Sequence, residues 1–249
     1  MILDDIVRST RLRIASLRHG EDFDDYRARS MVCAIKSAKK NAIISEVKFR
    51  SPSSGDMMRV ANPLAVAGEY QHNGASGISV LTEPVYFGGS PDYLTMIREF
   101  AGIPVLRKDF IIDERQLYET RRMHADAVLL IVALLGGRLA EFVELAESLS
   151  LQPLVEVHTE TELALALSTD AKMIGINNRD LRSMTIGTEA TRRLGPVVME
   201  SGLLAVSESG IRTPSDVASL KEYCDAFLVG TSLMSAPDPG ALLEAMVCA

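Results

Sequence analysis

Charged and amide side chains stand where short apolar segments of this chain end. They are Glu46, Lys48, Lys108, Glu156, Asn177, Arg179 and Glu208. A lysine held beside carboxylates can act as a general acid or as an anchor for an anion, and the carboxylates can assist proton transfer. If the fold gathers these groups, they would support acid–base chemistry on an anionic substrate.

Strand periodicity indicates how these groups could meet. Residues two apart on a strand share a face, so Ile44, Glu46 and Lys48 lie together. A lone glutamate at a strand end is better explained as a solvated charge. Five strands ending in polar residues favour an active site, but only in a closed barrel, where the carboxyl ends of all strands converge.

Short β-branched and leucine-rich segments alternate with amphipathic ones from Asn41 onward. We predict strands at 42–48, 77–82, 104–108, 127–132, 153–157, 173–177, 204–208 and 226–229. We predict helices between and after them at 63–72, 91–100, 114–124, 138–149, 160–167, 188–194, 214–223 and 239–247. Ser90-Pro91 and Thr213-Pro214 are typical helix starts.

These elements predict an α/β fold, a (β/α)8 TIM barrel over 41–249 with an N-terminal helical extension over 1–40, all in one domain 1–249. The extension should hold two helices, with a break at His19-Gly20 and helical composition over 22–40. The alternative is an open doubly wound sheet. Its dinucleotide-binding version needs Gly-x-Gly-x-x-Gly after the first strand, and the chain has none there.

Composition excludes several classes of partner. The net charge of -7 argues against a nucleic-acid partner. No apolar stretch reaches about 18 residues, so no membrane span is predicted. Residues 1–13 lack the apolar segment of a signal peptide, so we expect a cytoplasmic protein. The three cysteines and four histidines are isolated, without metal-ligand spacing, so no metal site is predicted.

Two turns with small residues follow the last two predicted strands. They read Ser207-Glu208-Ser209-Gly210 and Val229-Gly230-Thr231-Ser232. Such turns let backbone N–H groups approach an anion, and the loops after strands seven and eight hold phosphate in many barrels. Ser51-Pro52-Ser53-Ser54-Gly55 has the composition of a mobile loop, which is either a plain connector or a lid.

The chain resembles the indole-3-glycerol phosphate synthase family. The resemblance covers about Ile43 to Met234 in the order of that family. Its most specific segments are Arg107-Lys108-Asp109-Phe110-Ile111 and Asn177-Asn178-Arg179-Asp180-Leu181. Further matching segments lie at 44–48, 51–53, 81–83, 87–90, 154–158, 206–211 and 227–230.

The resemblance implies a reaction without metal or organic cofactor. In it, 1-(2-carboxyphenylamino)-1-deoxyribulose 5-phosphate undergoes ring closure, decarboxylation and dehydration to indole-3-glycerol phosphate, a step of tryptophan biosynthesis. Lys108 is implied as the general acid, Glu156 as a carboxylate assisting proton transfer, Lys48 as a dehydration residue and Glu46 as its support. The remaining implied roles are substrate binding by Ser51, Phe87, Asn177, Arg179, Glu208 and Ser209, and phosphate binding by Gly210, Gly230 and Thr231.

Two other functions compete with this interpretation. A phosphoribosylanthranilate isomerase would need Cys and Asp at strand ends, where this chain has no cysteine. A silent barrel acting as a scaffold would be expected to lose Lys108 or Glu156, and both are present. We therefore expect a small phosphorylated substrate, no nucleic acid and no membrane. We also expect a monomer, and leave open an association with other tryptophan-pathway enzymes.

Overall fold

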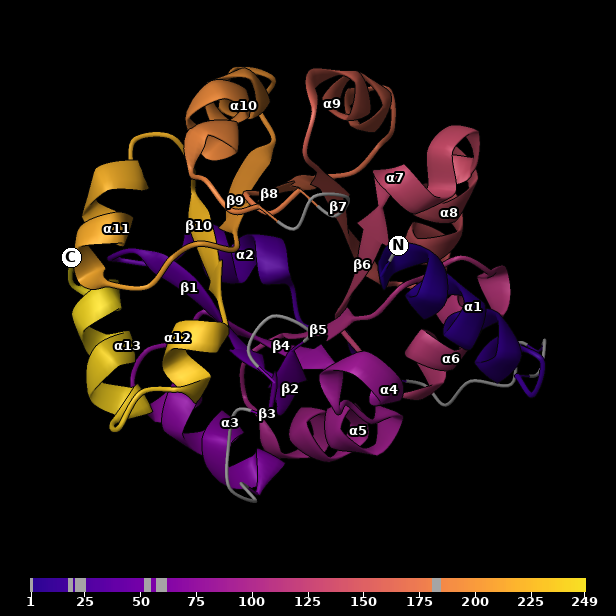
Figure 1. Ribbon diagram of the computed structural model, residues 1–249, viewed down its shortest axis with the longest axis horizontal. Helices are drawn as coiled ribbons and strands as arrows, with labels where there is room; N and C mark the ends of the chain where they lie inside the picture. Colours follow the sequence, from indigo (N-terminus) through magenta and orange to yellow (C-terminus); the bar gives the residue numbers. More distant parts are fainter. Residues whose placement is uncertain (1, 18–19, 21–25, 52–54, 57–61, 181–184) are drawn as a thin grey trace.

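The computed structural model describes residues 2–17, 20, 26–51, 55–56, 62–180 and 185–249. In this part of the chain, eight parallel strands close into a barrel, and helices surround it (Figure 1). The strands are β1 (Ala42–Val47), β4 (Gly77–Leu81), β5 (Val105–Lys108), β6 (Ala127–Ile131), β7 (Gln152–Val157), β8 (Met173–Asn177), β9 (Leu204–Glu208) and β10 (Ala226–Val229). Each pairs with its neighbour in chain order, and β10 closes the barrel against β1. The predicted (β/α)8 barrel is confirmed, with every strand within one residue of its predicted bounds.

The helices alternate with the strands. Those around the barrel are α3 (Pro63–His72), α5 (Pro91–Phe100), α6 (Glu114–Arg122), α8 (Leu139–Ser148), α9 (Glu160–Leu167), α10 (Glu189–Glu200), α11 (Pro214–Leu220) and α13 (Pro239–Val247). Short helices follow three strands: α4 (Pro84–Phe87), α7 (Val132–Leu135) with the 3-10 turn Gly136–Arg138, and α12 (Thr231–Met234). The predicted starts are confirmed, since Ser90 and Thr213 accept N-cap hydrogen bonds from Asp92 and Asp216.

Alternating strand residues form two separate cores. The outward residues, such as Ile78, Val155 and Ile174, pack beneath the helices. The inward residues, such as Leu154 and Leu228, fill the barrel itself. Because the strands are buried on both faces, they appear in the sequence as nearly continuous apolar runs that turn polar only at the carboxyl ends.

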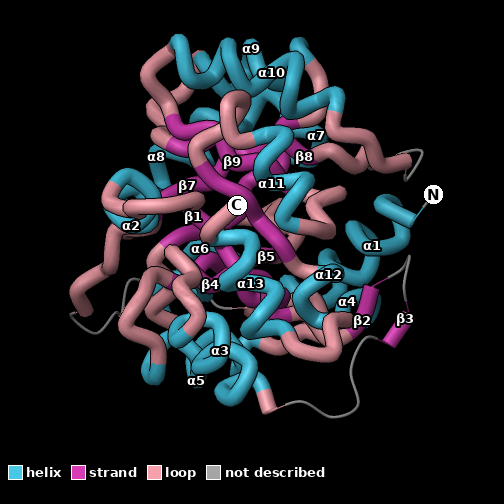
Figure 2. The backbone as a smooth tube through the Cα atoms, turned by 90° about the vertical axis from the view of Figure 1, so that its left-hand side faces the viewer, coloured by secondary structure: helices cyan, strands magenta, loops and turns pink. Residues whose placement is uncertain are grey.

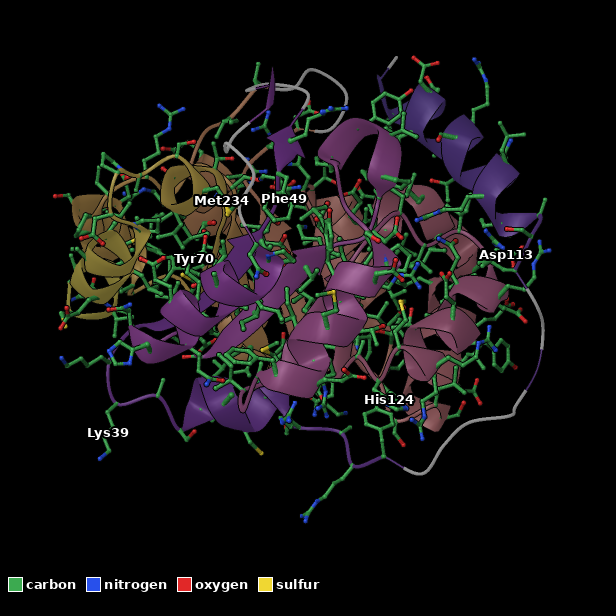
Figure 3. All side chains as sticks on the ribbon, turned by 90° about the horizontal axis from the view of Figure 1, so that it is seen from below. Lys39, Phe49, Tyr70, Asp113, His124 and Met234 are labelled. Atoms are coloured by element: carbon green, nitrogen blue, oxygen red, sulfur yellow. The ribbon has the colours of Figure 1, made fainter. Side chains whose placement is uncertain are left out.

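The N-terminal extension covers both ends of the barrel. Helix α1 (Ile2–Ile14) lies beside α4 at the carboxyl end of the strands, and α2 (Met31–Lys36) lies at the opposite end (Figure 2). Both contribute to the interior core, through Ile6 of α1 and through Met31 and Ile35 of α2. Figure 3 shows the same polarity, with Phe49 and Met234 toward one end and Lys39 and His124 toward the other.

The predicted second helix over 22–40 was wrong in extent. Residues 26–30 are irregular, and 21–25 lie outside the described residues. The backbone N–H groups of Arg29 and Met31 donate to the side chains of Asp126 and Gln152 of the barrel, at 2.7 Å each. These tertiary hydrogen bonds replace helical ones, and the helix begins only after its N-cap, Ser30.

The helix predicted at 188–194 was wrong at its end. It continues through Gly195-Pro196 to Glu200, although this dipeptide is typical of a helix break. Leu194 and Val198 are both buried against the barrel, so tertiary packing outweighs the local preference. Within the described residues, no helix is long and apolar enough to cross a membrane.

Candidate active site

A cavity of about 630 Å³ opens at the carboxyl ends of the strands. It collects every predicted site residue except Ser51. These residues are Glu46, Lys48, Phe87, Lys108, Glu156, Asn177, Arg179, Glu208, Ser209, Gly210, Gly230 and Thr231. Ser51 ends the two-residue strand β2 (Arg50–Ser51), which pairs with β3 (Gly55–Asp56). Its side chain and residues 52–54 lie outside the described residues, so the prediction of a lid stays a prediction.

The end of β1 sends alternate side chains to opposite faces. Val47 and Phe49 belong to the outer core, where the Phe49 ring lies 5.4 Å from that of Tyr93 on α5. Glu46 and Lys48 therefore turn into the cavity, and Lys48 Nζ donates to Glu46 Oε1 at 2.6 Å. Both side chains are nearly buried, so the pair is a fixed positive and negative couple on one wall of the cavity.

Lys108 lies between two carboxylates at the floor of the cavity. Its Nζ donates to Glu208 Oε2 at 2.9 Å and to Glu156 Oε2 at 3.3 Å. Burial alone would lower the pKa of Lys108, but the charges of Glu208, Glu156 and Glu46 outweigh burial and raise it. The ammonium group therefore stays charged at neutral pH in the free protein.

Burial has the opposite effect on the pKa of Glu208, because it disfavours the charged form of a carboxyl group. Burial raises the pKa of this carboxyl to about 7, against the opposing charge of Lys108 and with a further rise from Glu156. Its Oε1 atom is buried and has no hydrogen-bond partner among the described residues. Glu208 can therefore gain or lose a proton near neutral pH, the range in which general acid–base groups work best.

Two glycines leave space for the carboxylates of Glu208 and Glu46. A Cβ atom on Gly175 of β8 would lie 2.0 Å from Glu208 Oε1, and one on Gly230 would lie 2.2 Å from Glu46 Oε1. Gly230 does not have a positive φ. The close approach of Glu46 therefore explains why a glycine stands at position 230, independently of any role in phosphate binding.

Asn177, the last residue of β8, orients the carboxylate of Glu156 on the neighbouring strand β7. Its Nδ2 donates to Glu156 Oε1 at 3.0 Å, and its Oδ1 accepts from the backbone N–H of Arg179 at 2.9 Å. The imidazole Nδ1 of His158 lies 2.7 Å from the Asn177 carbonyl oxygen. Burial lowers the pKa of Arg179, opposed by Glu46 and reinforced by Arg212.

The turns after β9 and β10 meet at one end of the cavity. Ser209 and Gly210 have φ of 66° and 82°, in the left-handed region. Ser232 Oγ donates to the Ile211 carbonyl oxygen at 2.9 Å and so joins the two turns. Arg212 also lines this end. The backbone and the cation together give an environment suited to an anion.

The opposite side of the cavity is apolar and includes helix α1. The rings of Phe87 and Phe110 lie 5.8 Å apart, and Leu3 and Ile6 of α1 line the same space. Arg13, near the end of α1, donates to both oxygens of Asp109 at 2.8 Å. The charges of Arg107 and Arg13 outweigh burial and lower the pKa of Asp109 to about 2.

Sequence reasoning missed several residues of this cavity. They are Leu3, Ile6, Leu81, Asp109, Phe110, Leu129, Ile131, Ile186, Ile211, Arg212, Leu228 and Ser235. Strand alternation could have found Leu129 and Ile131, which share a face of β6. Nothing in the sequence indicates that Leu3 and Ile6 fold back over a site formed some 40 to 230 residues later.

Comparisons with known proteins identify the family of this chain. The family model for indole-3-glycerol phosphate synthase matches residues 3–246. An indole-3-glycerol phosphate synthase from Carboxydothermus hydrogenoformans is 44% identical over 84% of this chain and 80% of its own length. One from Methanopyrus kandleri is 40% identical over 98% of this chain and 97% of its own.

Among solved structures, a tryptophan synthase from M. tuberculosis has a TM-score of 0.63 at 15% identity, covering 89% of this chain and 98% of that one. KGPDC from Streptococcus mutans has a TM-score of 0.63 at 13% identity, covering 83% of this chain and 95% of that one. At these identities the structural likeness speaks for the barrel fold alone. The family match and the relatives above 40% identity together show that this chain belongs to the indole-3-glycerol phosphate synthase family.

Proposed function

We propose that this chain converts 1-(2-carboxyphenylamino)-1-deoxyribulose 5-phosphate to indole-3-glycerol phosphate, with release of carbon dioxide and water. The observation that carries the proposal is the arrangement of Lys108 between Glu156 and Glu208 on the floor of the cavity. A charged lysine held by two carboxylates can deliver a proton to a carbonyl oxygen directly above it. Membership of the family supports the same reaction.

In the proposed ring closure, the ring carbon that bears the carboxylate attacks the ketone carbon of the sugar chain. Lys108 donates its proton to the ketone oxygen, and Glu156 and Glu208 hold the ammonium group in place. Their charges raise the pKa of Lys108, which keeps the proton on the lysine until the substrate oxygen develops negative charge. Glu208 moderates this effect because part of its population is protonated near pH 7.

The later steps are proposed to use the wall formed by β1. The hydroxyl group formed from the ketone oxygen stays on the new five-membered ring after loss of carbon dioxide. It must depart as water while a proton passes from the ring system to a carboxylate such as that of Glu156. Lys48, held by Glu46 at 2.6 Å, would lie near the substrate carboxylate and protonate the departing hydroxyl. Glu156, oriented by Asn177 at 3.0 Å, would assist the proton transfers.

Two ends of the cavity suit the two ends of the substrate. We propose that the turns containing Ser209, Gly210, Gly230 and Thr231 bind the phosphate through backbone N–H groups. Phe87 lies at the apolar end, where an aromatic ring can pack against it. Arg179 and Asn177 would hold the middle of the substrate, and Ser51 its carboxylated ring.

The test is to incubate purified protein with the carboxyphenylamino-deoxyribulose phosphate, with a chelator and no added metal, and to follow indole fluorescence. We expect product from the wild type and none from Lys108→Ala, with unchanged folding by circular dichroism. Lys172 is an exposed lysine just before β8, at the far end of the barrel. The variant Lys172→Ala is therefore the matched control and should retain full activity. No product from folded wild-type protein would refute the proposed reaction.

A further inference from the structure

Asn178 is a buried amide between two cavity residues that does not itself line the cavity. It follows Asn177 at the end of β8, and only 1% of it is exposed. Its backbone N–H donates to the Glu208 carbonyl oxygen at 2.8 Å, and its carbonyl accepts from Gly187 at 3.0 Å. The residue is therefore fixed between β9 and the loop that leads to α10.

The side chain of Asn178 uses both its donor and its acceptor. Nδ2 donates to Ser207 Oγ and to the Ser209 carbonyl oxygen, each at 3.1 Å. Oδ1 accepts from the backbone N–H of Thr191 at 3.2 Å and from its hydroxyl at 3.0 Å. A carboxylate of the same shape would keep the acceptor and lose the donor, so the contact with Ser209 requires an amide.

The hydrogen bond to Ser209 determines which way the next peptide group faces. A trans peptide is planar, with its C=O and N–H groups pointing in opposite directions. Because the Ser209 carbonyl is held toward Asn178, the N–H of Gly210 points away from Asn178, and Gly210 itself lines the cavity. The left-handed φ values of Ser209 and Gly210 belong to this same turn.

We propose that Asn178 is a positioning residue for the phosphate end of the site: it aims the Gly210 N–H at the bound phosphate by holding the Ser209 carbonyl. This inference rests on the proposed phosphate position at the Gly210 turn. It assigns to the second asparagine of Asn177-Asn178-Arg179 a task different from that of its neighbours, which face the cavity themselves. Its effect is on binding rather than on proton transfer, because no atom of Asn178 touches Lys108, Glu156 or the Glu208 carboxylate in the described contacts.

Asn178→Asp is the decisive variant, and Thr191→Val is its matched control. The aspartate removes the donor to Ser209. The valine removes the Thr191 hydroxyl, with its hydrogen bonds to Asn178 Oδ1 and Ser207 Oγ, and keeps the amide that donates to the Ser209 carbonyl. We expect Asn178→Asp to raise KM about tenfold, the factor that corresponds to 1.4 kcal/mol, and to leave kcat within about threefold. The dissociation constant of inorganic phosphate, measured by calorimetry without turnover, should rise by the same factor. A merely structural role would lower Tm in both variants alike and would not divide KM from kcat.

The control should keep the KM and the phosphate affinity of the wild type. If Asn178→Asp does not fold, Asn178→Ala removes donor and acceptor together without a buried charge, and the same criteria apply. Unchanged KM and phosphate affinity, or a loss confined to kcat, would overturn the inference. A wild type that binds phosphate but forms no indole product would refute the proposed reaction, while the phosphate affinities of the variants would still decide the role of Asn178.

Discussion

Gly175→Ala is the sharpest perturbation of the floor of this site, because it changes a residue that makes no polar side-chain contact. An ideal Cβ at this position would lie 2.0 Å from Glu208 Oε1, whereas real Cβ contacts essentially never fall below 3.0 Å. The carboxylate must therefore retreat by about 1 Å. Glu208 Oε2 now accepts from Lys108 at 2.9 Å, and a retreat of that size takes it beyond hydrogen-bond distance.

The cost has two parts. Losing a hydrogen bond to a charged group costs about 1.5–3 kcal/mol, and forcing a methyl group into a packed interior costs about 1–3 kcal/mol. Partial relaxation of the carboxylate, which is the end of a flexible side chain, brings the expected loss of unfolding free energy to about 3 kcal/mol. For a domain of this size that corresponds to a fall in Tm of about 6–12 °C. Moving this carboxylate also misplaces the ammonium group of Lys108, which it holds. A misplacement of about 1 Å lowers kcat on the order of 100-fold.

Gly187→Ala is the matched control. Gly187 lies in the loop that follows β8, and a Cβ there would meet nothing within 4 Å. Tm by circular dichroism and kcat by indole fluorescence should be close to wild type in this control and reduced in Gly175→Ala. If the two alanine variants have the same Tm and the same kcat, then Gly175 does not make room for Glu208, and the account of the cavity floor is wrong.

Three other predictions concern charge. The pKa of Glu208 in the folded protein, about 7, exceeds its ordinary value of 4.5. The free energy of unfolding should therefore fall as pH rises through this window, by about 3 kcal/mol at 1.36 kcal/mol per pKa unit. The denaturant midpoints measured at pH 5 and at pH 8 should differ less in Glu208→Gln than in the wild type. Arg13→Met leaves Asp109 with Arg107 but detaches α1, so Tm should fall and KM should rise, and an unchanged KM would show that α1 is not part of the binding surface. Arg212→Ala should raise KM about two- to fivefold, as for an exposed charge pair, with a smaller effect at high salt; equal KM values at low salt would place the phosphate elsewhere.

Much of the barrel could be predicted from the sequence, because its strands are apolar on both faces until they end. One face of β1 and the residue after it shows this change from apolar to charged side chains. The face begins with Ile44 in the core and continues with Glu46 and Lys48, which line the cavity. Once the barrel is inferred, the convergence of five such ends follows from topology. The pairing of Lys108 with Glu156 and Glu208 then needs only the register of the strands.

The extension could not be placed from its sequence. The periodicity of α1 indicates a helix, but its position over the cavity depends on Arg13 reaching Asp109, 96 residues away along the chain. Likewise, residues 26–30 have helical composition but form no helix. The backbone N–H of Arg29 donates a hydrogen bond to the side chain of Asp126 instead. Local preference is a weak guide where a partner distant in sequence satisfies the backbone.

The interior glycines show a signal that the strand register contains and the local sequence does not. Glu208 on β9 pairs with Asn177 on β8, so Gly175 lies two residues earlier on the same inward face, where the Glu208 carboxylate leans. Ser45 pairs with Val229, which brings Glu46 beside Gly230 in the same way. In sequence, Gly230 suggests a turn for phosphate; across the sheet, it makes space for a carboxylate. An inward glycine beside an inward acid on the neighbouring strand thus indicates a buried carboxylate. The two carboxylates found in this way, Glu46 and Glu208, each accept a hydrogen bond from a lysine.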